Sequence, residues 1–322
     1  MLEHVSGSPP AEKELDSRIS LQKLEILRMV VEVGTVTGTA ERMYVAQPVI
    51  TAHLQSLEGR LGVELFVRKG RRLELTDEGE RVYSWACGVL DRGRDMMVEL
   101  DALNRGARGA ARLGASMSIG SYRLPAVLSE FRLARPQAQI ALTIGNPETV
   151  LVGVEQGDFD FAVLILDRPP EDLPLAAELL GSEEIVLVTA PDGLPDSEAV
   201  PLNHLCKLPI VGSPRGSIRR RLIDQTLARF GVHEYETVLE LGHAEAIKRA
   251  VDQGLGAALL FRSAVEVELA RDALREVHFT GATLAVPIYA VKREDKVFSE
   301  LQTHLLDAIR ERIASVSPKR EG

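Results

Sequence analysis

The hydrophobic pattern of the chain opens with apolar residues at every third or fourth position, which is the spacing of an amphipathic helix. Leu24, Leu27 and Val30 follow this spacing and predict a helix over residues 21–33. Gly34 comes next and can adopt the left-handed conformation that ends many helices. The first element of the fold is therefore a helix with a glycine stop.

Two further short helices are expected. Thr37 can cap a helix that runs through Ala40, and a third helix begins near Gln47 and stops at Gly62. Pro48 is tolerated because it falls in the first turn of the third helix. Three short helices joined by tight turns predict a helix-turn-helix core.

A hairpin and a long helix complete this region. Short apolar runs at 65–67 and 73–75 flank a basic segment, which predicts a two-stranded wing. Thr76 can then cap a helix that extends over residues 76–104.

An apolar seam runs along the long helix at alternating spacings of three and four. Its members are Val82, Ala86, Val89, Gly93, Met96, Leu100 and Leu103. So narrow a seam is typical of a coiled coil, which predicts that the helix pairs with its copy in a second chain. The alternative is that the seam packs on the C-terminal part of its own chain.

Beyond a glycine-containing hinge at 104–112, short apolar runs alternate with helical patterns. Expected strands lie near 113–119, 139–145, 160–165, 185–190, 236–241, 256–260 and 286–291. Expected helices lie near 121–134, 147–156, 217–230, 243–253 and 295–316. This alternation favours an α/β fold with parallel sheets and crossover helices.

Composition narrows the class of protein. The chain has 322 residues, 45% of them hydrophobic, which is enough for two or three domains with cores. No apolar run approaches a membrane span, and residues 1–20 lack the basic and apolar regions of a secretory signal. Residues 1–20 are expected to be disordered and the protein cytoplasmic, with no membrane contact. Cys87 and Cys206 are interpreted as free thiols, and neither a metal nor a cofactor is expected.

The charge is unevenly distributed. The net charge is −9, yet five basic residues face a single acid, Glu64, between positions 60 and 72. A local basic stripe on an acidic protein is suited to contact with nucleic acid phosphates.

Residues 21–79 resemble the winged helix-turn-helix of the LysR-type transcriptional regulators. The resemblance rests on Gly34 to Thr37, Ala40 and Glu41, Gln47 and Pro48, LQSLEGRLGVELFVR from Leu54, and LTDEG from Leu75. A C-terminal segment, LGHAEAIKRAVDQGLGAALLFRSAV from Leu241, resembles the same family. Together they extend the resemblance over residues 21–316.

The resemblance implies a DNA-binding domain, a dimerising linker helix, and an effector domain like a type 2 periplasmic solute-binding protein. The corresponding ranges are 21–75, 76–104 and 111–316, the last divided into subdomain I (111–180 and 285–316) and subdomain II (181–284). Such regulators usually form tetramers on promoter DNA and are controlled by a small effector. RNA polymerase is a further candidate partner, and activation and repression both remain open.

In a helix-turn-helix the second helix of the motif places its N-terminal residues against base edges. Gln47 can hydrogen-bond an adenine, and the basic wing can meet phosphates. The expected DNA contacts are Thr37, Gln47, Pro48, Val49, Thr51, His53, Arg68, Lys69, Arg71 and Arg72. Ala46 and Ala52 replace the serine and arginine common in the family, which puts the preferred DNA sequence in doubt. The alternative is that these are ordinary solvated residues.

Ligands of such domains bind at strand ends, where helix N-termini present free amides. The expected effector contacts are Ser116, Met117, Ser118, Asn146, Arg215, Ser217 and His243. Amides, hydroxyls and one guanidinium suit a small carboxylate or phosphate. The alternative for the serines is plain capping, and His243 can either touch the effector or cap its helix.

An enzyme is disfavoured, because the chain lacks G-x-S-x-G, H-E-x-x-H and P-loop motifs, and GLGAAL from Gly254 breaks the dinucleotide fingerprint. A transport-type solute-binding protein would not need the helix-turn-helix. A constitutive architectural DNA-binding protein would not need a ligand cleft.

Overall fold

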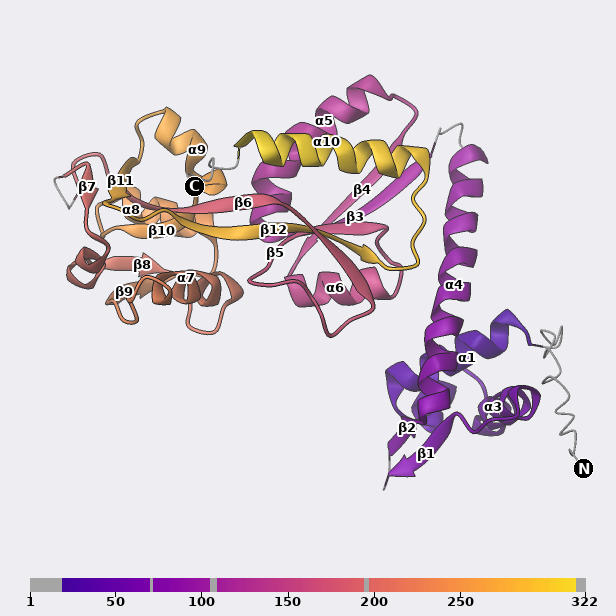
Figure 1. The fold of residues 1–322 in the computed structure, drawn as a ribbon. Helices are drawn as coiled ribbons and strands as arrows, with labels where there is room; N and C mark the ends of the chain where they lie inside the picture. The colour runs from indigo at the N-terminus through magenta and orange to yellow at the C-terminus, as the bar shows by residue number, and fades with distance from the viewer. Residues whose placement is uncertain (1–18, 70–71, 105–108, 194–196, 317–322) are drawn as a thin grey trace, which may run out of the picture. The chain divides into compact units, whose positions relative to one another are not determined.

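The computed structural model describes residues 19–69, 72–104, 109–193 and 197–316. The chain forms two compact units that divide between Val98 and Glu99, inside the long helix drawn in Figure 1. Most of the N-terminal stretch expected to be disordered, and hinge residues 105–108, lie outside the described residues.

The first unit contains the predicted three helices, a hairpin and most of the long helix. They are α1 (Leu21–Val33), α2 (Val36–Arg42), α3 (Gln47–Leu61), β1 (Phe66–Lys69), β2 (Arg72–Leu75) and α4 (Asp77–Asn104). Gly34 and Gly62 end their helices with φ of 76° and 70°, as predicted. The prediction for Thr37 as a cap is wrong, because Thr37 lies inside α2. Thr35 caps α2 by accepting a hydrogen bond from the Gly38 amide at 3.2 Å.

The long helix begins as predicted, with the Thr76 hydroxyl accepting the Gly79 amide hydrogen bond at 2.8 Å. The predicted seam divides into two parts. Its N-terminal members contribute to the core of the first unit: Ala86 is buried, and Val82 and Val89 pack against the same cluster. Three short helices enclose little apolar volume, so the first turns of α4 complete that core. Met96 and Leu100 are exposed by 56% and 45%, and only this later stretch is open for a partner.

The second unit alternates strands and helices from Ala110 onward. Its strands are β3 (Ala110–Ser116), β4 (Gln139–Gly145), β5 (Phe161–Ile165), β6 (Leu175–Thr189), β7 (Ala199–Val200), β8 (Ile210–Gly212), β9 (Thr237–Glu240), β10 (Ala258–Phe261), β11 (Arg275–Phe279) and β12 (Leu284–Arg293). Its helices are the π-helical turn η1 (Ile119–Arg123), α5 (Leu124–Ala134), α6 (Pro147–Glu155), the 3₁₀ helix η2 (Leu202–Lys207), α7 (Ile218–Ala228), α8 (Ala244–Asp252), α9 (Arg262–Ala270) and α10 (Glu300–Val316).

The main sheet is mixed, which corrects the expectation of purely parallel sheets. Its order is β4-β3-β5-β12-β6-β11-β7, with β10 also paired to β6. The strands β3, β4 and β5 are parallel, whereas β12 is antiparallel to both β5 and β6. The hinge is shorter than predicted, because β3 already begins at Ala110. The last helix, α10, begins at Glu300 rather than near 295.

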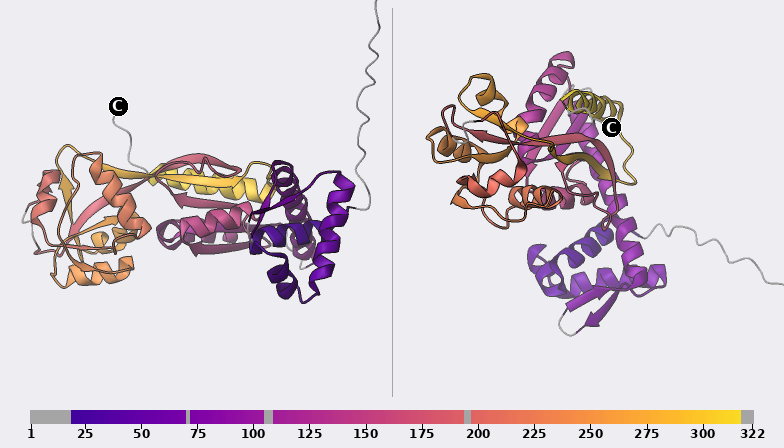
Figure 2. Two further views of the ribbon diagram at one scale, coloured as in Figure 1. Left: turned by 90° about the horizontal axis from the view of Figure 1, so that it is seen from below. Right: turned by 60° about the vertical axis from the view of Figure 1, so that its left-hand side comes forward.

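Two long strands join the two lobes of the second unit. The strands β6 and β12 pair from Leu175 with Arg293 to Ile185 with Leu284, with a register shift at Ile288 and Tyr289. Figure 2 shows them running from one lobe into the other in both views. Both lobes therefore contain part of this pair of strands. Below, subdomain I and subdomain II denote the expected ranges 111–180 with 285–316, and 181–284.

Helices cover the sheet of subdomain I on both faces. Figure 1 shows α5 and α10 on one side and α6 on the other. Phe131, Leu305 and Ile309 bury the first face, and Val150 and Val154 bury the second. In the part of the chain that the structure describes, no helix is both long and apolar enough to cross a membrane.

Candidate DNA-binding surface and effector cleft

The helix α3 has one buried face and one exposed face. Ile50 and Leu57 are fully buried in the core of the first unit. Gln47, Pro48 and Val49 are exposed on the first turn, and Thr51 and His53 are partly exposed further along. The predicted recognition residues thus share an accessible surface, as DNA contact requires.

Thr37 and Gln47 are linked side chain to side chain. The Thr37 hydroxyl donates a hydrogen bond to Gln47 Oε1 at 3.3 Å. This contact restrains the amide that would read a base, and Oε1 keeps a second lone pair for an adenine amino group. Thr37 therefore positions Gln47 even though it does not cap α2.

The wing has the predicted hairpin register, in which Lys69 pairs with Arg72. Arg71 lies outside the described residues, and so do the side chains of Arg68, Lys69 and Arg72. Their expected phosphate contacts stay predictions.

In the second unit, residues predicted from four separate segments line one cleft of about 530 Å³. These residues are Ser116, Met117, Ser118, Asn146, Ser217 and His243. The first four come from strand ends of subdomain I and the last two from helix N-termini of subdomain II. The convergence follows from the sheet topology, because β3 and β4 run parallel and end at the same edge.

Most of these polar groups already have a structural partner. Asn146 and Ser217 cap α6 and α7 through the amides of Glu148 and Arg220, and His243 Nδ1 accepts the Glu245 amide hydrogen bond at 3.3 Å. His243 is thus a cap, as one of the two expectations had it, and it also lines the cleft; its contact with an effector stays a prediction.

The two serines of the β3 end differ from each other. Ser116 is buried and its hydroxyl oxygen accepts the Ile165 amide hydrogen bond at 3.3 Å. Ser118 is only 6% exposed and does not cap η1, which begins at the next residue. Of these two serines, Ser118 is therefore the one whose hydroxyl is available to a ligand in the cleft.

Arg215 is not among the residues that line this cleft, so its expected effector contact stays a prediction. It occupies an exposed turn in which the Ser217 amide donates to the Pro214 carbonyl and Gly216 has φ of 84°. That turn places Arg215 on a separate cavity of about 1000 Å³ within subdomain II. Residues of subdomain II alone line this larger cavity. It is therefore a weaker candidate than the cleft for a site that responds to movement of the two subdomains.

Arg219 supplies the positive charge of the cleft instead. Its Nη1 donates to the Ser213 hydroxyl at 3.2 Å. Burial lowers the pKa of the Arg219 guanidinium below its ordinary value, although the group remains charged at neutral pH. Arg219 could have been proposed from the sequence, because it follows the capping Ser217 by two residues. The sequence offers no reason, however, to prefer it over the two arginines that come directly after it.

Polar contacts tie the subdomains together beside the cleft. The Tyr122 hydroxyl of η1 donates to Glu245 Oε1 of α8 at 2.8 Å, and Lys248 pairs with the same carboxylate at 2.7 Å. Burial and the neighbouring Glu245 carboxylate raise the pKa of Tyr122, which keeps its proton. Burial opposes the ionisation of Glu245, but the Lys248 ammonium and the Tyr122 hydroxyl outweigh it and lower the pKa of Glu245.

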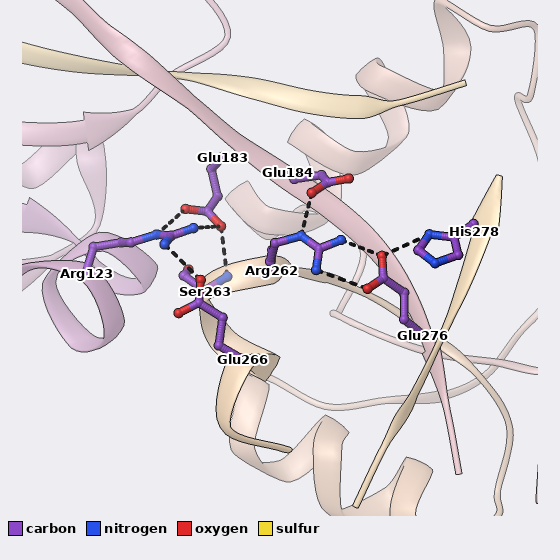
Figure 3. A network of polar contacts seen from close by, with 8 residues as sticks. All are labelled: Arg123, Glu183, Glu184, Arg262, Ser263, Glu266, Glu276 and His278. Atoms are coloured by element: carbon purple, nitrogen blue, oxygen red, sulfur yellow. Dashed lines mark hydrogen bonds and ion pairs between the residues drawn. The ribbon is translucent and has the colours of Figure 1, made fainter. Parts of the chain in front are cut away.

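A second group of contacts starts from the next residue, Arg123 (Figure 3). Arg123 Nε donates to the fully buried Glu183 carboxylate of β6 at 3.1 Å, and Nη1 reaches Glu266 of α9 at 2.9 Å. The Ser263 amide donates to the same Glu183 carboxylate at 2.9 Å. Arg123 of subdomain I thus binds both the connecting strand β6 and the helix α9 of subdomain II.

The fold and these two sites define a class of protein: a DNA-binding unit with an exposed recognition helix, joined to a ligand-binding unit of two subdomains. Two family profiles match the chain. The profile described as "LysR substrate binding domain" matches residues 104–314, and "Bacterial regulatory helix-turn-helix protein, lysR family" matches residues 21–80. The chain belongs to the LysR family of transcriptional regulators.

Known proteins of this kind resemble it along most of its length. An uncharacterised HTH-type transcriptional regulator, YeiE of Escherichia coli strain K12, is 34% identical over 91% of this chain and 95% of its own. ArgP from Mycobacterium tuberculosis is 18% identical with a TM-score of 0.64, covering 94% of this chain and 99% of its own. Full-length CbnR complexed with its target DNA is 20% identical with a TM-score of 0.54, covering 92% and 100%.

Proposed function

We propose that this LysR-type regulator is controlled by a small anion bound between its two effector subdomains. The main support for this proposal is that residues of both subdomains line one cleft: Ser118 of subdomain I, and Ser217, Arg219 and His243 of subdomain II. Hydroxyl groups, helix N-termini and a guanidinium all favour negative charge. We retain the boundaries 21–75, 76–104 and 111–316 for the three functional parts.

The DNA-binding role rests on the exposed first turn of α3. Gln47 would read a base, Thr37 would hold its amide, and the wing would contact phosphates. CbnR has been crystallised with its target DNA, and a comparable engagement of promoter DNA is expected for this chain. The protein would act in the cytoplasm, where promoter DNA and RNA polymerase are found.

Self-association would use the exposed C-terminal half of α4. Met96 and Leu100 lie four residues apart on one stripe and are 56% and 45% exposed. Apolar side chains so exposed favour pairing with a second copy. A dimer through α4, and a tetramer of two such dimers, is the expected assembly.

Effector control requires coupling between the cleft and DNA binding. An anion that contacts Ser118 on one side and Ser217 on the other would favour the closed arrangement of the subdomains. Because a ligand shifts an equilibrium only by its differential affinity for the two states, a coupling of about 1–3 kcal/mol is expected.

The test is a thermal-shift screen of small organic acids and sugar phosphates, followed by footprinting on the promoter DNA that the protein binds. A genuine effector should lose its effect in Ser118→Leu and in Ser217→Leu, while both variants still bind the operator. A stabiliser that acts equally on both variants would place the effector site elsewhere.

A further inference from the structure

We infer that the effector is a small monocarboxylate with an apolar body, and that Arg219 is the residue that selects its carboxylate. This inference rests on the proposed function and makes it specific. Three features of the cleft carry it: the pairing of neighbouring arginines, the balance of charge, and an apolar wall.

The arginines at positions 219, 220 and 221 of α7 differ in their partners. Arg220 Nε pairs with Asp224 at 2.8 Å, and Arg221 Nη2 pairs with Glu148 of α6 at 3.3 Å. Arg219 has the Ser213 hydroxyl as its partner and, among the residues that the structure describes, no carboxylate within ion-pair distance. A desolvated guanidinium without a counter-ion is costly, so the site favours an anion from outside.

The charge balance of the cleft favours one negative charge over two. Arg221 and Glu148 both line the cleft and neutralise each other, which leaves Arg219 as the uncompensated charge among its described lining residues. A dianion would neutralise Arg219 and then carry a second charge for which the described lining residues offer no unpaired cation. Holding that second charge without a counter-ion in a partly desolvated cleft is unfavourable.

Part of the cleft lining is apolar, and this part is called the apolar wall below. It consists of Met117, Ile165, Ile218, Leu222 and Phe261. Met117 is 43% exposed, so a ligand can cover it and gain the free energy of removing apolar surface from water. An inorganic oxyanion cannot use this wall and would fill little of a cleft of about 530 Å³.

The inference is tested on the full-length protein by isothermal titration calorimetry with butyrate and benzoate. Their uncharged isosteres butyramide and benzamide test the charge, succinate tests a second charge, and sulfate and phosphate test the apolar body. At least one monocarboxylate should bind more tightly than its amide, than succinate and than either inorganic anion.

The arginine is tested with Arg219→Met. Loss of a charge-assisted hydrogen bond should weaken monocarboxylate binding roughly 10- to 100-fold, and Arg219→Lys should recover part of it. The matched control is Arg215→Met, which removes the same charge four residues earlier but outside the cleft, and it should bind like the wild type. Circular dichroism and operator binding establish that each variant is folded.

The outcomes separate this inference from the proposed function. If sulfate or phosphate binds at least as tightly as both carboxylates and depends on Arg219, the ligand class is wrong while a cleft anion stands. If Arg219→Met binds monocarboxylates as the wild type does, Arg219 is not the selecting residue. If binding of every anion persists in Ser118→Leu and Ser217→Leu, the proposed function itself fails.

Discussion

Removing the guanidinium of Arg123 should destabilise the effector unit strongly, because it leaves a buried charge behind. The Glu183 carboxylate is 0% exposed, and without Arg123 the Ser263 amide is its remaining hydrogen-bond donor among the described residues. Breaking a buried ion pair by removing one partner costs about 3–5 kcal/mol. The contact with Glu266 adds little, since that carboxylate is 46% exposed. The expected loss for Arg123→Met is therefore about 3–5 kcal/mol.

Two further variants separate charge burial from lost packing. In Arg123→Met/Glu183→Gln the neutral amide can still accept the Ser263 hydrogen bond, so the loss should shrink by about 2 kcal/mol or more. Arg310→Met is the matched control, because Arg310 pairs with Glu178 on the same strand at 2.8 Å but at 40% and 48% exposure. That exposed pair should contribute less than about 1 kcal/mol.

The assay is urea unfolding of the full chain followed by two probes. Trp85, the single tryptophan, lies in α4 within the first unit, and its fluorescence follows the DNA-binding unit. Far-ultraviolet circular dichroism follows both units. The dichroism transition should move to lower urea in Arg123→Met while the fluorescence transition stays in place. A variant as stable as Arg310→Met, or a double variant no more stable than the single one, would refute the reasoning.

Three further outcomes are expected. Gln47→Ala should lose about 1–3 kcal/mol of discrimination between operator and random DNA, whereas Arg71→Ala should weaken binding to both kinds of DNA alike. Competition binding assays measure this, and an unchanged ratio of operator to random-DNA affinity in Gln47→Ala would contradict the assigned recognition helix. Met96→Glu should dissociate the assembly in sedimentation experiments, and an unchanged mass would contradict pairing through α4. Because the pKa of Glu245 is lowered in the folded protein, its pairing with Lys248 should stabilise the protein at neutral pH and lose this effect as the pH falls below about 4. Glu245→Gln should then be less stable than the wild type by about 1 kcal/mol or less at pH 7 in thermal unfolding, and this difference should shrink as the pH is lowered into the acidic range.

The elements predicted from local signals agree closely with the structure. The helix α1 ends where Gly34 can turn, and the long helix runs from Asp77 to Asn104 as its pattern indicated. Elements whose residues depend on distant partners were missed. The helix α9 contains Val265, Val267 and Leu269, an alternation typical of a strand, and the fold overrides it. The strand β6 was predicted only from 185, because Glu183 and Glu184 interrupt its apolar run.

The same distinction explains the candidate cleft. Its serines could be predicted, because the strand ends and helix starts that carry them are local features. The choice of Arg219 could not, since the partner that neutralises Arg221 is Glu148, 73 residues away in sequence. Which of the three adjacent arginines stays without a counter-ion depends on one pair within α7, Arg220 with Asp224, and on one contact between α7 and α6, Arg221 with Glu148. The proposed anion selectivity would therefore be a tertiary property that sequence periodicity does not contain.

A last prediction concerns the start of the recognition helix. Ala46 has φ of −75° and ψ of 140°, the extended geometry of a helix cap, yet it makes no side-chain capping bond. Ala46→Ser would supply a hydroxyl that accepts an amide hydrogen bond from the first turn and should stabilise the DNA-binding unit by about 0.5–2 kcal/mol. The Trp85 fluorescence transition should then move to higher urea. Operator affinity should also rise, because a serine there can donate to a phosphate while the Thr37 contact to Gln47 stays in place. Ala46→Gly is the control for backbone effects, and equal stability of the serine and alanine proteins would show that the first turn of α3 is already satisfied by water.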